Sequence, residues 1–211
     1  MNILKMNEPI QGAAVTEPFN ERSVIYSLGR GTDVEAESFH QYHLLLVAQG
    51  KIECYALNER GIQNRWTIRQ GGLTMLPKDM PVGVNALEDS VYIRISAVRK
   101  EDIDLDIEEE KEYLIKDLAP YVDQNVNVAR IIFNEQMGVT LLALDENTSY
   151  ACDTKANSGI TATEGSFDIV YEGKTITVHQ SEVIVVEKGK HLEIHAAHGR
   201  TRLSVIQNFL S

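Results

Sequence analysis

The chain has 211 residues, of which 43% are hydrophobic and 24% charged, as in ordinary globular proteins with one large or two small domains. Its formal net charge of −11 argues against direct binding to nucleic acid, because contacts to phosphates require basic residues. The sequence contains no apolar run of about 18 residues, so no membrane-spanning segment is predicted.

The N-terminal residues and the cysteines bear on location. Residues 1–12 contain one lysine, an acidic residue and only a short apolar run, a composition that does not match a signal peptide. The two cysteines, Cys54 and Cys152, do not make a disulfide framework. Together these features favour a protein of the reducing cytoplasm.

An internal repeat organises the rest of the chain. Residues 21–50 align without a gap with residues 136–165, at an offset of 115, and each copy ends in Gln-Gly or Glu-Gly. Residues 66–86 align with residues 176–196 at an offset of 110, so the hairpin between the two blocks is shorter in the second copy. Each copy is predicted to hold seven or eight short strands, the number expected of a β-sandwich or barrel.

Between the copies, an acidic segment rich in helix-forming residues predicts a linker. Its centre, residues 107–116, is predicted to form a short helix that Pro120 ends. The predicted organisation is an N-terminal barrel at 1–99, an acidic, partly helical linker at 100–124 and a C-terminal barrel at 125–211.

The repeated blocks resemble the cupin superfamily, whose members are small double-stranded β-helix (jelly-roll) barrels. The resemblance is carried by "HLLLVAQGKIECY" and "TATEGSFDIVYEGKTITV" in the first block, and by "IRQGGLTMLPKDMPVGV" and "VHQSEVIVVEKGKHLEI" in the second. It extends over nearly the whole chain outside the linker and the N-terminal segment. The fold it implies is all-β, with two tandem cupin barrels, a bicupin, joined by the short helical linker.

Cupin metal sites use a His-x-His pair, a Glu five residues on and a final His, a set that the resemblance allows us to look for. In the first copy the corresponding residues are Ala36 and Ser38 (or Glu37 after a one-residue shift), His43 and Val82. In the second copy they are the residues around Cys152, then Gly159 and Leu192. Each copy keeps at most one donor, whereas a catalytic divalent site requires three or more protein ligands. The resemblance therefore implies barrels that lack most of the usual metal ligands.

Several polar side chains are candidates for lining a ligand pocket, since such pockets orient a ligand with a few polar groups. They are Tyr26, His40, Tyr42, His43, Arg94 and Cys152. The competing interpretation for the tyrosines, histidines and arginine is an outward-facing or structural role, and for Cys152 an inert buried thiol.

Residues 191–195 read His-Leu-Glu-Ile-His, so on a strand the polar and apolar side chains point to opposite faces. Because Leu192 aligns with Val82 in the repeat, we expect Leu192 inside the barrel and both histidines outside. The alternative is a site for Fe, Mn, Ni or Zn, with candidate ligands His40, His43, His191 and His195.

The leading functional hypothesis is a non-catalytic bicupin that binds a small sugar-like or organic-acid molecule and acts as a sensor or accessory factor, with no cofactor. One alternative is a metal-dependent isomerase or dioxygenase with an atypical histidine site. Another is a purely structural or oligomerising protein. A homodimer is a further expectation, while no nucleic-acid or membrane partner is expected.

Overall fold

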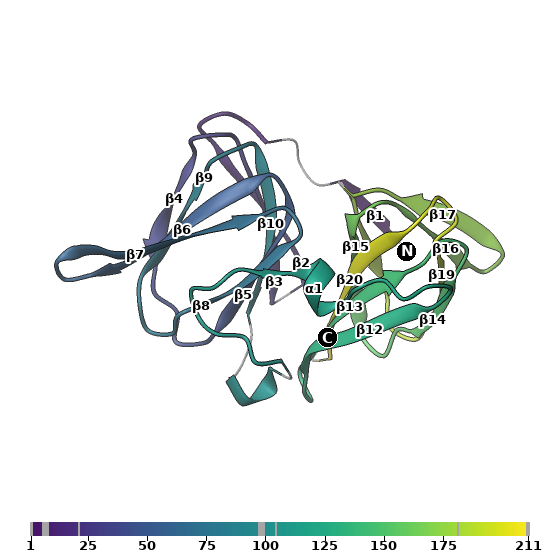
Figure 1. The fold of residues 1–211 in the computed structure, drawn as a ribbon. Coiled ribbons are helices and arrows are strands. Elements are labelled where there is room, and N and C mark those ends of the chain that lie inside the picture. Colours follow the sequence, from purple (N-terminus) through teal and green to yellow (C-terminus); the bar gives the residue numbers. More distant parts are fainter. Residues whose placement is uncertain are drawn as a thin grey trace. The chain divides into compact units, whose positions relative to one another are not determined.

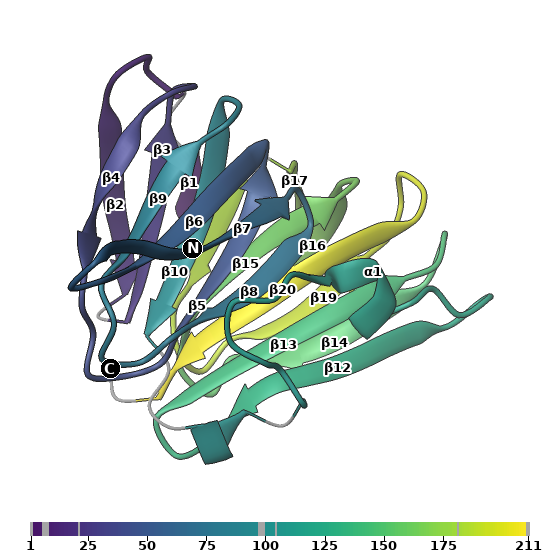
Figure 2. The same cartoon turned by 60° about the vertical axis from the view of Figure 1, so that its left-hand side comes forward.

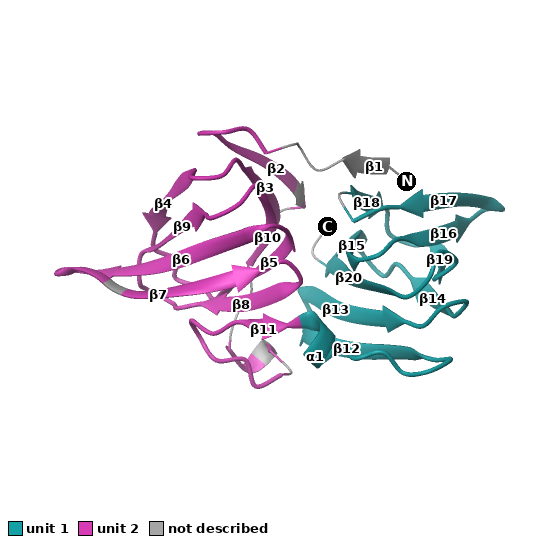
Figure 3. Ribbon diagram, turned by 45° about the horizontal axis from the view of Figure 1, so that its top comes forward, with its two compact units in different colours: residues 1–5, 115–211 teal, residues 6–114 magenta. Residues whose placement is uncertain are grey.

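The structure is a computed structural model that describes residues 2–5, 9–20, 22–96, 100–103, 105–180 and 182–209. It divides into an N-terminal unit, Met6–Leu114, and a C-terminal unit, Ile115–Ser211 together with Met1–Lys5 (Figure 3). Strands make up nearly all of the regular structure, which confirms the all-β class. The sequence-based divisions lie after residues 99 and 124, whereas the units divide at residue 114.

The N-terminal unit is formed by two antiparallel sheets (Figure 1). The larger has the strand order β11-β8-β5-β10-β3-β2 and the smaller the order β4-β9-β6-β7. Their bounds are β2 Ala14–Asn20, β3 Ser23–Leu28, β4 Asp33–Glu37, β5 His43–Gln49, β6 Lys51–Asn58, β7 Gly61–Arg69, β8 Gly72–Leu76, β9 Val82–Ala86, β10 Ser90–Ser96 and β11 Tyr113–Leu114, with the 3-10 helix η1 at Lys100–Asp102.

The C-terminal unit repeats this plan. Its larger sheet has the order β1-β18-β15-β20-β13-β12 and its smaller sheet the order β14-β19-β16-β17. Figure 2 shows β12, β13 and β20 side by side, as their pairing requires. The bounds are β1 Asn2–Lys5, α1 Ile115–Leu118, β12 Val126–Phe133, β13 Met137–Leu144, β14 Ser149–Asp153, β15 Asn157–Glu164, β16 Phe167–Tyr171, β17 Lys174–Val178, β18 Glu182–Val186, β19 His191–His195 and β20 Thr201–Asn208.

The core of each unit is built from side chains of both its sheets. Because successive side chains of a strand point to opposite faces, alternate residues are buried. In β6 these are Ile52, Cys54 and Ala56, which pack with residues of β3 and β5 from the other sheet. In β19 they are Leu192 and Ile194, which lie in the core of the C-terminal unit.

Matching turns and hydrogen bonds support the internal repeat. Gly50 and Gly165 both have a positive φ, 74° and 72°, so the offset of 115 holds between β5 and β6. The amide of Gly31 donates to the carbonyl of Ala86, and the amide of Asn147 donates to the carbonyl of Ala196. Ala86 therefore corresponds to Ala196, which confirms the second offset of 110. Gly31 corresponds to Asn147, an offset of 116 where the alignment had 115. The ungapped alignment of residues 21–50 is wrong by one residue there.

The extra residue lies in a β-bulge of β4. The register between β4 and β9 shifts between Val34 and Glu37, whereas β14 pairs with β19 without a shift. A bulge reverses the side-chain alternation beyond it. Glu37 consequently pairs with Val82, a core residue, as Cys152 pairs with Leu192 in the C-terminal unit.

The helix predicted over residues 107–116 is wrong. In the described part of this segment, Tyr113 and Leu114 form β11, which pairs with β8 and completes the larger sheet of the N-terminal unit. Among the described residues of the predicted linker, the α-helix is confined to Ile115–Leu118. Pairing with an open sheet edge outweighs the helix-forming composition, because helix propensities are worth only tenths of a kcal/mol per residue. No helix among the described residues is long and apolar enough to cross a membrane.

Candidate functional site

The candidate site lies at one end of the N-terminal unit. In an antiparallel arrangement the start of one strand lies beside the end of its neighbour. Here β3 and β5 start beside the end of β10, β5 also starts beside the end of β8, and β9 starts beside the end of β4. Glu37, at the end of β4, pairs with the core residue Val82 on the neighbouring strand β9. His43, at the start of β5, pairs with the core residue Leu76 on the neighbouring strand β8. Their side chains are thereby directed to the inner face of this end.

Arg94 is the central cation of this end. It is two residues beyond Tyr92 on β10, so both side chains lie on the same face, and Tyr92 belongs to the core. The Arg94 guanidinium carbon lies 5.0 Å from the ring centre of Tyr26 and 4.8 Å from that of Phe39. Its Nη1 donates to Oε2 of Glu37 at 3.1 Å. The Arg94 side chain is 21% exposed, so solvent reaches a guanidinium that aromatic rings hold in place.

His43 is the most unusual polar residue of the site. It is only 6% exposed and its ring centre lies 4.1 Å from that of Phe39. Its Nδ1 is buried and has no hydrogen-bond partner among the described residues, a condition that costs about 1–3 kcal/mol. Burial, and secondarily the charge of Arg94, lowers the pKa of His43 to about 4. His43 is therefore neutral at pH 7 and has hydrogen-bonding capacity that no described residue uses.

Tyr26 and Tyr92 lie directly across from each other on β3 and β10, and their rings stack at 4.8 Å with an interplanar angle of 3°. Both belong to the core, and Tyr26 also contacts Arg94, so the aromatic pair connects the polar end with the apolar interior. Burial raises the pKa of Tyr26, against the opposing effect of the Arg94 charge. At neutral pH this hydroxyl is therefore protonated and can donate a hydrogen bond.

The C-terminal unit has mostly apolar residues at the positions that correspond to the polar site of the N-terminal unit. The correspondence follows from the strand pairing: Arg94 lies between Val24 and Leu45, as Val205 lies between Thr140 and Ile160. The corresponding pairs are Tyr26 and Leu142, Glu37 and Cys152, His43 and Ser158, Tyr92 and Leu203, and Arg94 and Val205. Counting the cupin ligand positions had indicated Gly159 here, whereas the offset of 115 and the strand pairing both give Ser158. The fold thus forms without a charged or aromatic residue at any of the five positions.

The other predicted pocket residues do not join this cluster. His40 is on the surface with a 93% exposed side chain, and its Nδ1 lies 2.8 Å from Oδ1 of Asp79. Tyr42 is half-buried and directly precedes β5. Cys152 lies in the core of the C-terminal unit, where burial raises the pKa of its thiol. Of the six candidates, the structure brings together Tyr26, His43 and Arg94.

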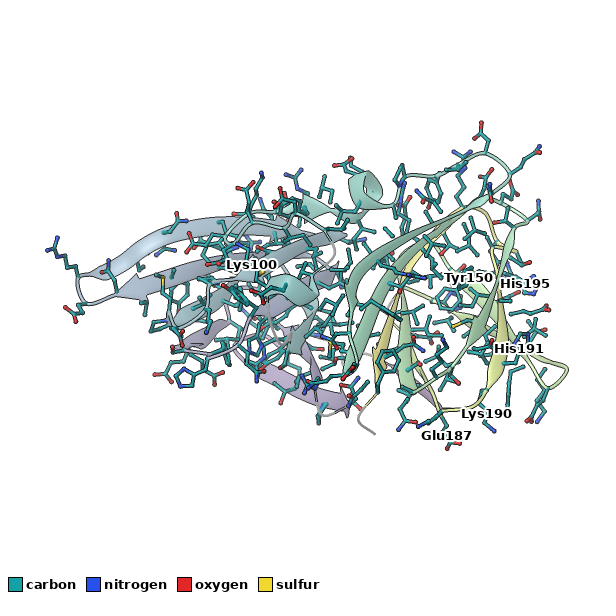
Figure 4. The ribbon with its side chains drawn as sticks, turned by 90° about the horizontal axis from the view of Figure 1, so that it is seen from below. Lys100, Tyr150, Glu187, Lys190, His191 and His195 are labelled. Atoms are coloured by element: carbon teal, nitrogen blue, oxygen red, sulfur yellow. The ribbon has the colours of Figure 1, made fainter. Side chains whose placement is uncertain are left out.

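The two histidines of β19 lie on the outer face of the C-terminal unit, as the register predicted; His191 is exposed and His195 half-buried. Figure 4 shows His191 and His195 apart from each other along the strand. The Nδ1 of His191 lies 2.7 Å from a carboxylate oxygen of Asp153, and the Nε2 of His195 lies 3.2 Å from one of Glu193. The inward residue between them, Leu192, is fully buried.

The donors present do not fit a metal centre of the expected kind. Among the described residues, no group of three or more His, Cys, Asp or Glu side chains is arranged to hold a metal ion. Glu37 and His43 stand at two of the expected ligand positions, but Val82 occupies the closing one and Arg94 places a positive charge beside both. A cation next to a candidate ligand pair disfavours a second, divalent cation.

Sequence reasoning missed Phe39 and Tyr92 as members of the site. The spacing of Tyr92 and Arg94 was the available signal, because residues two apart on a strand share a face. Phe39 lies between β4 and β5, outside any strand, and its contacts with His43 and Arg94 depend on the path of that loop. Periodicity does not predict such a path.

The lowered pKa of His43 predicts an acid-sensitive stability. Between pH 6.5 and about 4, the unfolded chain protonates this histidine while the folded protein keeps it neutral. The unfolded state therefore binds more protons, and this group lowers the stability by up to about 1.4 kcal/mol per pH unit as the pH falls through that window. We expect His43→Leu to lose this contribution, so its stability relative to the wild type rises as the pH falls.

Urea unfolding at about pH 7 and about pH 5 measures the difference. The control is His191→Leu, which removes an exposed histidine from the other unit. A stability difference between His43→Leu and the wild type that stays constant with pH would contradict the buried, neutral state of His43.

With the geometry established, comparison with known proteins identifies the fold. No family model and no curated sequence matches the chain. A cupin 2 conserved barrel domain protein from Leptotrichia buccalis is similar in structure, with a TM-score of 0.75 and 13% identity over 98% of this chain and 96% of that protein. The E162A mutant of Bacillus subtilis oxalate decarboxylase has a TM-score of 0.60 and 12% identity over 98% of this chain and 76% of the enzyme. The chain has the cupin fold, so the resemblance seen in the repeat is confirmed for the fold.

A further Bacillus subtilis oxalate decarboxylase structure, of an enzyme with Mn(II) centres, has a TM-score of 0.61 and 12% identity over the same shares of the two chains. Identities this low establish similarity of fold alone. The chemistry of this chain has to be argued from its own residues.

Proposed function

We propose that the chain is a bicupin whose N-terminal barrel binds a small sugar-like or organic-acid molecule at the end formed by Tyr26, His43 and Arg94, in a sensor or accessory role. The observation that carries the proposal is the unpartnered Nδ1 of the buried His43, beside an arginine that is held by two aromatic rings. Proteins rarely leave a buried polar atom without a partner, and a ligand would supply one.

The C-terminal unit supports the same conclusion as an internal comparison. It builds the same strand arrangement with Ser158 and Val205 where the N-terminal unit has His43 and Arg94. Ser158 satisfies its own hydroxyl by donating to the carbonyl of Ala156. Folding therefore does not require the polar cluster, and the unpartnered Nδ1 of His43 is better explained by binding.

The decisive experiment is a thermal-shift screen of small sugars and organic acids. A compound present at about 100 times its dissociation constant should stabilise the folded protein by about 2.7 kcal/mol. We expect a compound that raises the Tm of the wild type to lose its effect in Arg94→Met and in His43→Leu. The matched control is Arg65→Met, because Arg65 also pairs with a glutamate, Glu53, and lies over the ring of Tyr55.

Retention of the shift in Arg94→Met, or its loss in Arg65→Met, would contradict the proposed site. A screen without any stabilising compound would contradict binding itself. The metal-dependent isomerase or dioxygenase finds no specific support in the donor geometry, so we do not advance it as a second function. The homodimer and the cytoplasmic location stay predictions.

A further inference from the structure

Glu37 is held at the site by a local departure from the repeat. The bulge in β4 is absent from β14, and it alone turns the Glu37 side chain toward Arg94. Without it, the alternation of β4 would direct Glu37 to the outer face. Because of the bulge, the Glu37 carboxylate of the protein itself pairs with the Arg94 guanidinium.

This internal ion pair is easily opened. The Glu37 side chain is 60% exposed, and an exposed ion pair contributes only about 0–1 kcal/mol. Arg94 does not depend on Glu37 for its position, because the rings of Tyr26 and Phe39 hold its guanidinium. If Glu37 moves away, the Arg94 guanidinium stays in place. Its positive charge and its paired N–H donors suit the binding of another carboxylate.

The neighbourhood of Arg94 adds a neutral donor. Phe39 contacts both Arg94 and His43, with ring-centre distances of 4.8 and 4.1 Å, so the two residues flank one aromatic ring. The neutral imidazole can carry its proton on the unpartnered Nδ1. One carboxylate group bound to Arg94 could then also accept this hydrogen bond.

From this geometry we infer that Glu37 occupies the place of a ligand carboxylate, and that the site takes a small organic acid which displaces Glu37 from Arg94 and accepts a hydrogen bond from His43. This inference rests on the proposed function and narrows its ligand class. It selects organic acids over neutral sugars, because displacement of Glu37 leaves an unpaired positive charge. Glu37 thus acts as an internal competitor of the ligand.

The test compares wild type, Glu37→Gln and Glu35→Gln by calorimetric titration with acetate, malonate and benzoate. The matched neutral probes are acetamide, malonamide, benzamide and glucose. Glu35→Gln is the control, since Glu35 is an exposed residue of the same strand. We expect carboxylate affinity to rise about two- to fivefold in Glu37→Gln, the range for loss of an exposed competing ion pair, and to stay unchanged in Glu35→Gln.

The possible outcomes separate this inference from the proposed function. Binding of glucose or an amide that disappears in Arg94→Met keeps the site but overturns the organic-acid class. Weaker carboxylate binding in Glu37→Gln would make Glu37 a ligand contact and overturn the competitor role. If none of the probes binds to the wild type, the organic-acid inference fails, while the broader screen of sugars and acids decides the proposed function.

Discussion

Leu192→Ala is expected to lower the free energy of unfolding of the C-terminal unit by about 2–5 kcal/mol. Leu192 is fully buried on β19 and packs in the core formed by both sheets of that unit. Removal of a buried leucine loses the transfer energy of its side chain and leaves a cavity, which together account for that range. Urea unfolding followed by far-UV circular dichroism is the appropriate measurement, because the single tryptophan, Trp66, lies in the other unit.

The neighbouring residue provides a matched control for this prediction. His191 is exposed beside Leu192 on the same strand, and its partner Asp153 is exposed as well. Such surface substitutions usually change stability by less than about 0.5 kcal/mol, and we expect this of His191→Ala. If His191→Ala proves as destabilising as Leu192→Ala, the register of β19 is wrong, and the histidines face the interior.

Gly50→Ala is expected to be comparably destabilising, by about 2–5 kcal/mol, for two reasons that add. Gly50 has a φ of 74°, where an L-residue costs about 1–2 kcal/mol. A Cβ at this position would also lie 2.2 Å from the carbonyl oxygen of Asp89, and relief of such overpacking costs about 1–3 kcal/mol. Tryptophan fluorescence reports the effect, because Gly50 and Trp66 are in the same unit.

Gly71→Ala separates these two contributions. Gly71 has nearly the same φ, 70°, but a Cβ there would have no neighbour within 4 Å. It should therefore show only the conformational cost, about 1–2 kcal/mol. Equal losses in the two variants would mean that the close approach of Asp89 is relieved without cost.

Much of the fold could be predicted because the sequence contains an internal repeat. Alignment of the chain with itself showed that one strand pattern occurs twice, and the alignment of Leu192 with Val82 correctly predicted which face of β19 is buried. The one-residue error at Gly31 has a specific cause, since the bulge of β4 adds a residue without a hydrophobic signal. The missing linker helix has another, because β11 forms only through pairing with the distant strand β8.

The candidate site was less predictable than the fold. Tyr26, His43 and Arg94 could be singled out because they are polar or amphipathic residues within apolar strands. Their grouping depends on which strand ends meet, and the role of Phe39 depends on a loop. Glu37 enters the site only through the bulge, so its contact with Arg94 could not be derived from alternation.

The strand order has a consequence for how the protein is made. In each large sheet the last strand of the repeat is central: β10 lies between β5 and β3, and β20 lies between β15 and β13. At typical synthesis rates of about 5–20 residues per second, the synthesis of β3 precedes that of its partner β10 by roughly 3–13 s. During that interval β3 and β5 have no central strand to join them, and their apolar edges are open to other nascent chains. Tyr26, His43 and Arg94 come from these same strands, so the polar end of the N-terminal unit forms only when β10 is inserted.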